Sequence, residues 1–231
     1  MRFKDRVFAI TGAAQGIGRR VAERAAQEGA TVAVIDRSPI GAEVADAIKA
    51  AGGQATYLTA DLETYAGAES AMAGVMAAFG RIDVLVNNVG GTIWAKPFEQ
   101  YEAAQIDAEV RRSLFPTLYS CHAVLPHMLA VSNGVIVNVS SIATRSLNRV
   151  PYAAAKGGVN AITASLAWEL AESGIRVVAT APGGTEAPPR AVPRTRTNNR
   201  RRKRSGINRS SIRRSIPASC TATALWMNRQ G

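Results

Sequence analysis

The fold of this chain is decided by the stretch Val7-Phe8-Ala9-Ile10-Thr11-Gly12-Ala13-Ala14-Gln15-Gly16-Ile17-Gly18. Its first four residues are apolar, which is typical of a buried parallel strand. Glycines at positions 12, 16 and 18 follow, and the amphipathic residues 19–27 predict a helix. Such a helix offers unpaired N–H groups and a partial positive charge at its N-terminus, which suits a pyrophosphate. The alternative is a strand–turn–helix unit that binds no ligand.

A second apolar strand, Thr31-Val32-Ala33-Val34-Ile35-Asp36, ends in an acid. Asp36 lies 18 positions beyond Gly18, close to where a dinucleotide-binding fold places the carboxylate that holds the adenosine ribose. Its charge would repel a 2′-phosphate, so it favours NAD over NADP, although the adjacent Arg37 weakens that preference. The alternative is an ordinary turn residue at the end of a strand.

The glycine spacing is Gly12-x3-Gly16-x-Gly18 with Thr11 in front, and this form resembles the short-chain dehydrogenase/reductase family. The resemblance implies an α/β fold of the Rossmann type, with a doubly wound parallel sheet in a single domain, and NAD as the cofactor. The cofactor-binding residues that it implies are Gly12, Gln15, Gly16, Ile17, Gly18, Asp36, Asp61, Leu62, Asn88, Gly90, Tyr152, Lys156, Pro182, Gly183 and Thr185.

Length and composition limit the number of domains and the class of protein. The 231 residues are enough for one domain with an ample core. We find no run of 18 apolar residues and no signal peptide, so we expect no membrane partner. The two cysteines, Cys121 and Cys220, are too few and too scattered for a disulfide framework or a metal site, which fits a reducing cytoplasm. The family resemblance adds that intact members form homo-oligomers.

Strands alternate with helices throughout residues 7–181. We expect further helices within residues 40–51, 65–79, 111–130 and 152–171, and further strands within 54–60, 80–90, 135–141 and 175–181. Asn87-Asn88-Val89-Gly90 closes the fourth strand and matches a second signature of the family. There the first Asn stabilises the central sheet, and the backbone around the Gly passes close to the cofactor. By itself the pattern is an ordinary turn.

Asp61-Leu62 follows the third strand. The family places an acid like Asp61 beside the adenine ring. A second role, which can hold at the same time, is that of N-cap for the helix expected at residues 65–79.

The catalytic signature is Tyr152-x3-Lys156, whose members share one helix face. A Lys⁺ near a phenol favours the phenolate, as does the positive nicotinamide ring, so Tyr152 would accept a proton from a substrate hydroxyl near neutral pH. Lys156 would also reach the nicotinamide ribose. Ser141 would hold the substrate oxygen. Ser140 is the alternative, because the loop leading to Tyr152 is two residues shorter than expected for the family.

The helix expected at residues 111–130 carries a departure from the family. Members usually have an Asn there that helps to organise a proton-relay water, and our alignment places Ser113 at that position. Ser can bind a water but has a shorter reach. On the same helix, His122 and His127 have no nucleophile or metal partner at a suitable spacing, so we expect surface or packing roles for them.

The sixth strand is closed by Pro182-Gly183-Gly184-Thr185. In the family this loop covers the nicotinamide side of the cofactor. The threonine bonds the carboxamide, a role that falls on Thr185.

Non-generic stretches at residues 87–98, 111–118, 140–144 and 181–190 narrow the resemblance, which covers about residues 3–194. They resemble the branch of the family that oxidises cis-dihydrodiol carboxylates in benzoate-type aromatic degradation. The implied reaction uses NAD⁺ on a small-molecule diol carboxylate and gives a catechol with loss of CO₂. The substrate carboxylate needs a cation. Arg145 and Arg149 are the candidates, and the alternative for both is a solvated loop charge.

The net charge of +11 comes from the end of the chain, because residues 1–189 carry 16 basic and 17 acidic residues while residues 190–231 carry 12 basic residues and no acid. We expect an NAD-binding domain at residues 1–190 and a basic, disordered tail at 191–231 that does not continue the family. An inactive or truncated Rossmann-type protein with a tail that binds nucleic acid is one interpretation. However, the tail has no heptad repeat, zinc ligand or aromatic platform that would let it recognise a specific nucleic-acid sequence.

We favour a shift of reading frame between about Arg190 and Asn198 as the origin of this tail. In the frame that starts at the third base of each codon, the fixed bases of Trp226-Met227-Asn228 force Asp-Glu. A chain with such a slip lacks the substrate lid and part of the oligomer surface.

Overall fold

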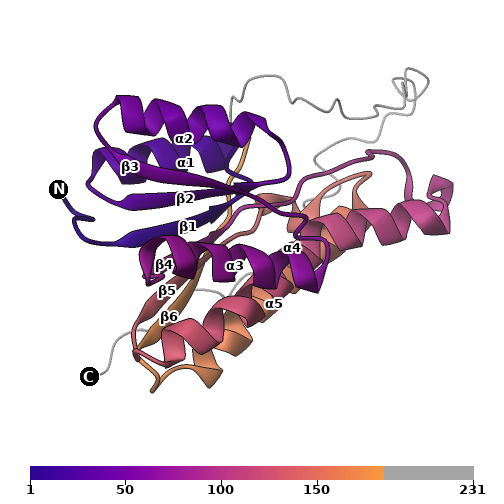
Figure 1. Ribbon diagram of the computed structural model, residues 1–231. Helices are drawn as coiled ribbons and strands as arrows, with labels where there is room; N and C mark the ends of the chain where they lie inside the picture. Colours follow the sequence, from indigo (N-terminus) through magenta and orange to yellow (C-terminus); the bar gives the residue numbers. More distant parts are fainter. Residues whose placement is uncertain (185–231) are drawn as a thin grey trace. The chain divides into compact units, whose positions relative to one another are not determined.

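The computed structural model describes residues 1–184. Its centre is a sheet of six strands in the order β3-β2-β1-β4-β5-β6 (Figure 1). Every neighbouring pair in the sheet is parallel. The strands are β1 (Val7–Thr11), β2 (Thr31–Asp36), β3 (Gln54–Thr59), β4 (Val84–Asn87), β5 (Gly134–Val139) and β6 (Ile175–Thr180).

Helices connect the strands and lie on both faces of the sheet (Figure 1). They are α1 (Gly16–Gln27), α2 (Ile40–Ala50), α3 (Tyr65–Phe79), α4 (Ala103–Leu129) and α5 (Val150–Glu169), with the short 3₁₀ helices η1 (Phe98–Gln100) and η2 (Ile142–Arg145). Helices α1 and α2 lie on one face, and α3, α4 and α5 lie on the other. The expectation of a doubly wound, Rossmann-type parallel sheet is therefore confirmed.

Each strand supplies side chains to two separate hydrophobic clusters, because successive side chains point to opposite faces. In β2, Ile35 belongs to the cluster beneath α3 and α4, whereas Val34 belongs to the cluster beneath α1 and α2. In β4, Leu85 and Val86 divide in the same way. Burial on both faces explains why these strands are continuous apolar runs rather than alternating ones.

The topology indicates that a ligand would bind at the carboxyl ends of the strands. The chain winds outward from β1 through β2 to β3 in one direction, and from β4 through β5 to β6 in the other. In open sheets of this kind, ligands bind outside the carboxyl ends of the strands, where the strand order reverses. That point lies between β1 and β4, which places the glycine turn and the Asn-Asn-Val-Gly turn side by side.

Two local expectations are wrong. Helix α4 begins at Ala103 rather than Arg111, because Glu102 and Gln105 form a capping box that starts the helix earlier. Thr64, not Asp61, is the N-cap of α3, and its side chain accepts the N–H of Gly67 at 3.1 Å.

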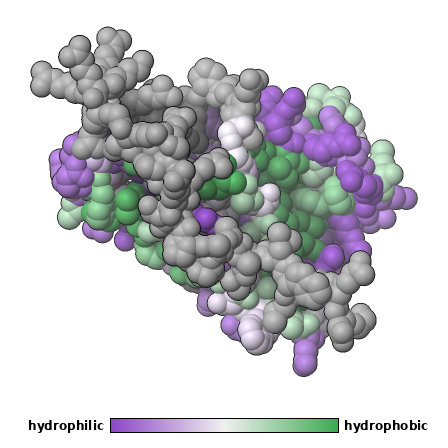
Figure 2. Space-filling model, turned by 180° about the vertical axis from the view of Figure 1, so that it is seen from behind, coloured by the Kyte–Doolittle hydropathy of each residue, from purple (hydrophilic) through white to green (hydrophobic). Residues whose placement is uncertain are grey.

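The surface mixes hydrophilic and hydrophobic areas. Seen from behind, a hydrophobic patch is flanked by hydrophilic residues (Figure 2). No helix within residues 1–184 combines the length and the apolar character that a membrane span requires.

Candidate active site

The glycine turn after β1 is built for close approach. Gly12 and Gly16 have φ values of +63° and +59°, in the left-handed region that favours glycine. An added Cβ at Gly18 would collide with the Gly12 carbonyl oxygen and the Asn88 side chain. A Cβ at Gly16 would meet nothing within 4 Å, so the turn is open at that point. The turn is closely packed at Gly18 and open at Gly16, which is the form that a pyrophosphate requires at a helix N-terminus.

Asn88 holds this turn from the neighbouring strand. Its Nδ2 donates to the carbonyl oxygens of Thr11 at 3.2 Å and Gly12 at 3.0 Å, and its backbone N–H donates to Thr11 Oγ1 at 2.9 Å. Asn87 points into the sheet instead, where its Nδ2 donates to Asn138 Oδ1 at 3.0 Å. The first Asn thus bridges β4 and β5, and the second joins the two turns at the switch point.

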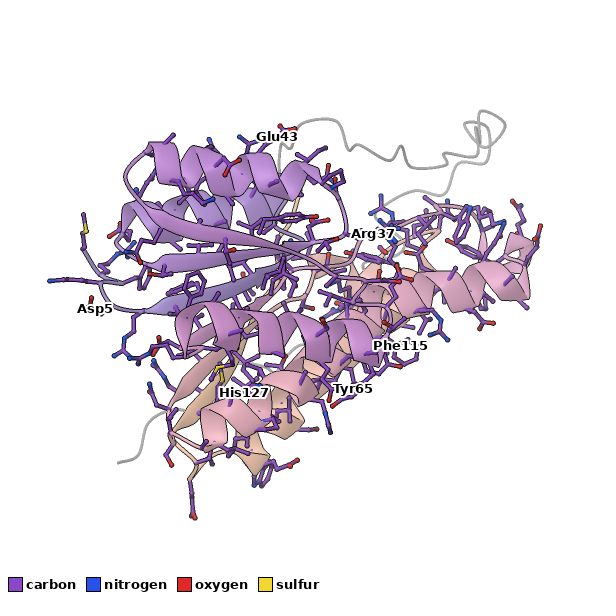
Figure 3. The ribbon with its side chains drawn as sticks, viewed as in Figure 1. Asp5, Arg37, Glu43, Tyr65, Phe115 and His127 are labelled. Carbon is purple, nitrogen blue, oxygen red and sulfur yellow. The ribbon has the colours of Figure 1, made fainter. Side chains whose placement is uncertain are left out.

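Asp36 lies at the carboxyl end of β2, beside the glycine turn. Its carboxylate accepts the backbone N–H groups of Ala14 at 3.0 Å and Ser38 at 2.9 Å. The neighbouring Arg37, labelled in Figure 3, pairs with Glu63 at 3.5 Å. The acid is therefore held at the turn, and the positive charge that follows it is partly compensated by Glu63.

Asp61 and Leu62 follow β3. The Asp61 carboxylate accepts the backbone N–H of Glu63 at 3.1 Å, and its carbonyl oxygen accepts the Thr64 hydroxyl at 3.0 Å. Leu62 is buried in the core beneath α3 and α4. This segment is folded into a tight turn at the same edge of the sheet as Asp36.

Lys156 is buried in α5, and its Nζ donates to the carbonyl oxygen of Val139 at 2.6 Å. Burial lowers the pKa of its ammonium group to about 8. A Cβ placed on Gly90 would lie 3.2 Å from this Nζ, so the Asn-Asn-Val-Gly turn and the lysine are in contact. Tyr152 is half-buried one helical turn earlier on the same face of α5.

The two serines after β5 differ in their surroundings. Ser140 is buried, and its hydroxyl donates to the backbone carbonyl of Lys156 at 3.3 Å. Ser141 is only half-buried, and its Oγ accepts the N–H of Ala143 at 3.1 Å as the N-cap of η2. As an acceptor in that contact, Ser141 keeps its own proton for another partner. This geometry favours Ser141 as the hydroxyl that would hold a substrate oxygen.

Ser113 lies fully buried on α4, where its Oγ accepts the N–H of Gly91 at 3.3 Å. Its Cα would be 3.5 Å from a Cβ placed on Gly90. The Gly90–Gly91 backbone is therefore in contact with both Ser113 and Lys156, so the structure brings the residue expected in the relay to the same turn as the lysine.

The loop after β6 returns to the serine strand. Pro182 accepts the N–H of Ile142 through its carbonyl oxygen at 3.3 Å, and Gly183 lies against the Ile142 side chain. Thr185, the residue expected at the carboxamide, and the basic tail lie outside the described residues.

The two histidines lie on α4. His122 is exposed and its Nδ1 lies 3.1 Å from the hydroxyl of Tyr65 on α3. His127 lies on the same helix (Figure 3). Within residues 1–184, no group of three or more His, Cys, Asp or Glu side chains is placed to hold a metal ion.

Sequence reasoning missed a polar cluster in the connection between β4 and α4. Glu109 of α4 is fully buried and accepts the backbone N–H groups of Ile93 at 2.9 Å and Trp94 at 3.1 Å. Lys96 is 8% exposed, and its Nζ lies 5.2 Å from the centre of the Tyr101 ring. Only the inclusion of Lys96 in a non-generic stretch, residues 87–98, could have drawn attention to it.

Comparison with known families matches residues 6–198 to short chain dehydrogenase. The chain belongs to the short-chain dehydrogenase family. Among curated relatives, the 1,6-dihydroxycyclohexa-2,4-diene-1-carboxylate dehydrogenase of Pseudomonas putida is 62% identical over 186 residues, 80% of this chain and 69% of the relative. The protein of the same name from Acinetobacter baylyi is 58% identical over 193 residues, 84% of this chain and 74% of the relative.

Solved structures agree. Levodione reductase superposes with a TM-score of 0.78 at 35% identity, covering 81% of this chain and 74% of that one. A metagenomic short-chain oxidoreductase in complex with NADP gives a TM-score of 0.75 at 34% identity, covering 80% and 85%. This short-chain dehydrogenase is therefore an oxidoreductase that acts on a CH–OH group with a nicotinamide cofactor.

Proposed function

We propose that the enzyme oxidises 1,6-dihydroxycyclohexa-2,4-diene-1-carboxylate with NAD⁺ and yields catechol and CO₂. The observation that carries this proposal is the identity of 62% and 58% to two relatives that bear the name of this dehydrogenase. Two placements support it: Tyr152 and Lys156 lie in the first two turns of α5, and η2, which Ser141 caps, packs against that helix. A secondary alcohol needs such a set of groups for deprotonation.

The residues present fit a dinucleotide. The turn with Gly16 open to the outside would take the pyrophosphate, and the Asp36 carboxylate would take the adenosine ribose. Lys156 would hold the nicotinamide ribose. Bound there, the cofactor supplies the hydride acceptor.

Proton removal is the task of the protein. Ser141 would donate its hydroxyl hydrogen bond to the substrate oxygen and fix its position. Tyr152, as the phenolate, would take the proton from the substrate hydroxyl while the carbon loses its hydride. The buried ammonium of Lys156 stabilises that phenolate. Ser113 would hold the water through which the proton leaves.

The product of this oxidation determines the next step. Loss of one hydride and one proton converts the secondary alcohol into a ketone beside the carbon that bears the carboxylate. The resulting β-keto acid breaks its carbon–carboxylate bond and releases CO₂. The electron pair left on the ring gives an enolate. It takes up one proton from water, which equals the proton removed from the alcohol, and becomes one of the two hydroxyl groups of catechol. Aromatisation draws the reaction forward.

The preference for NAD over NADP is supported by charge. The Asp36 carboxylate would repel a 2′-phosphate, and Arg37, the nearest residue in sequence that could attract one, pairs with Glu63 at 3.5 Å. We expect kcat/KM for NAD⁺ to exceed that for NADP⁺.

For the rest of the chain, we propose an NAD-binding domain at residues 1–190 and a basic tail at 191–231, in which a shift of reading frame makes the sequence depart from the family. The family match itself extends to residue 198. We place the enzyme in the cytoplasm, as a homo-oligomer when intact, without nucleic acid as a partner. The nucleotide sequence from the codon of Ala181 onward tests the frame: it should stay open in the third-base frame past Gly231, and an early stop would contradict the slip.

The role of Tyr152 is tested by replacing it with Phe. Tyr152→Phe should lose nearly all NADH formation from the diol carboxylate, while nucleotide binding persists. Tyr65→Phe, which removes a hydroxyl from the surface of α3, is the matched control and should remain active. An active Tyr152→Phe enzyme would exclude this tyrosine as the base.

A further inference from the structure

Lys96 is a buried cation in the connection between β4 and α4. Only 8% of the residue is exposed, and its Nζ lies over the face of Tyr101, 5.2 Å from the ring centre. None of the ion pairs within residues 1–184 includes Lys96. A buried charge is costly unless an opposite charge or a strong dipole compensates it. A cation–π contact compensates only part of that cost.

The backbone of Lys96 belongs to a clamp between two loops. Its N–H donates to the carbonyl oxygen of Asn148 at 2.9 Å. The Tyr101 hydroxyl donates to the carbonyl oxygens of Trp94 at 3.0 Å and Asn148 at 3.3 Å. Asn148 precedes α5 by two residues, in the loop between Ser141 and Tyr152.

The clamp therefore lies at the catalytic edge of the sheet. Strands β4 and β5 are parallel neighbours, so the loops that leave their carboxyl ends emerge side by side. One loop carries Lys96, and the other carries Ser141 and leads to Tyr152. Ligands of open sheets bind above this edge.

Glu109 of α4 fixes the position of the loop that carries Lys96, between β4 and α4. This fully buried carboxylate of α4 accepts the N–H groups of Ile93 and Trp94, which lie three and two residues before Lys96. Hydrogen bonds to a charged acceptor are among the stronger ones in proteins. The loop is thus held by α4 on one side and by Asn148 on the other, which would keep the lysine in a fixed position.

We infer that Lys96 is the residue that binds the carboxylate of the substrate, in place of Arg145 or Arg149. The inference rests on the proposed function, which supplies a substrate with a carboxylate. Arg145 is exposed and Arg149 is half-buried, so water screens their charges more than that of Lys96. A carboxylate arriving at Lys96 would supply the compensating charge, and it would orient the diol relative to Ser141 and Tyr152.

The direct test is the binding of benzoate to the NAD⁺-loaded enzyme, measured by calorimetry. Lys96→Met keeps the length of the side chain and removes its charge, and it should weaken binding by about tenfold or more. Lys96→Arg, which retains the charge, should restore most of the affinity. Arg145→Met, which removes the charge of an exposed arginine on the neighbouring loop, is the control and should stay within about threefold of wild type.

Two outcomes would overturn the inference. One is wild-type enzyme that binds benzoate no better than Lys96→Met. The other is an equal loss of affinity in Arg145→Met, which would show that the exposed arginine also carries the carboxylate. Thermal melting of each variant checks that it is folded.

Kinetics separate this inference from the proposed function. Lys96→Met should raise KM for the diol carboxylate by the same factor and leave kcat nearly unchanged. For cis-cyclohexa-3,5-diene-1,2-diol, which lacks the carboxylate, kcat/KM should be the same in variant and wild type. An equal loss on both substrates would contradict a role in carboxylate binding. A wild-type enzyme that fails to oxidise the diol carboxylate would refute the proposed function, and benzoate binding would still decide the role of Lys96.

Discussion

Replacing Gly18 with Ala tests how the two turns at the switch point fit together. Gly18 is buried in the first turns of α1, and a Cβ there would collide with the carbonyl oxygen of Gly12 and the Nδ2 of Asn88. Neither atom can move freely, because Asn88 Nδ2 donates to that same carbonyl oxygen at 3.0 Å. The matched control is Gly157→Ala in α5, where an added Cβ meets nothing within 4 Å.

Two opposing effects set the magnitude. Ala is favoured over Gly inside a helix by about 1 kcal/mol, so both variants would gain stability if space were free. Overpacking a tight site costs about 1–3 kcal/mol, and a collision with backbone lies at the upper end of that range. We expect a net loss of about 1–2 kcal/mol for Gly18→Ala. In a protein of this size that lowers Tm by roughly 2–8 °C.

The assay is thermal unfolding of both variants beside wild type, with NAD⁺ affinity measured on the same samples. Gly157→Ala should raise Tm by about 1–4 °C. Gly18→Ala should lower it and weaken nucleotide binding, because the turn that takes the pyrophosphate is displaced. If both variants gained equally and bound NAD⁺ as wild type does, the reasoning about this contact would be refuted.

Three further changes test charges in the described part of the chain. Asp36→Ala should raise kcat/KM for NADP⁺ relative to that for NAD⁺. Adding Glu63→Gln, which releases Arg37 from its ion pair, should increase that shift further. An unchanged ratio of the two kcat/KM values would contradict the role of Asp36. Lys156→Met should abolish oxidation but raise the free energy of unfolding at neutral pH by up to about 3 kcal/mol, because wild type holds a buried ammonium whose pKa is lowered to about 8. That gain should shrink as the pH rises from about 8 toward 10.5, the ordinary value, since native wild type sheds the proton first; a gain that is constant with pH would argue against this cause. Burial would raise the pKa of Asp83, but hydrogen bonds from Arg81, the Val7 N–H and Arg6 outweigh it and lower the pKa below 3.8. Asp83→Asn should therefore lower the free energy of unfolding at neutral pH and match wild type only in strong acid, below the native pKa. An equal difference at every pH would show that the charge of Asp83 is not involved.

Local sequence pattern predicts the elements of this fold well where tertiary structure agrees with it. The strand expected at Thr31–Asp36 and the helix expected at Tyr65–Phe79 have these same bounds in the structure. Both are marked by an apolar run or a glycine at the end. The strand is buried over Val32–Ile35, and the helix is buried on one face only. The start of α4 was not predictable from hydrophobic period, because the capping box of Glu102 and Gln105 sets it.

The residues of the candidate site also differ in how well the sequence predicts them. Tyr152 and Lys156 are readable because their chemistry requires a fixed spacing along one helix. Lys96 and Glu109 are not, because their surroundings depend on loops and a helix that meet only in the folded chain. A lone lysine or glutamate in a sequence is most often a solvated charge, and only burial identifies these two as exceptions.

The measurement that tests the central claim most directly is the stoichiometry of one reaction. Purified enzyme is mixed with 1,6-dihydroxycyclohexa-2,4-diene-1-carboxylate and NAD⁺, and NADH, catechol and CO₂ are quantified together. We predict that the three products form in equal amounts, and that NADP⁺ supports the reaction less well. NADH without catechol, or no reduction of NAD⁺ at all, would contradict the account.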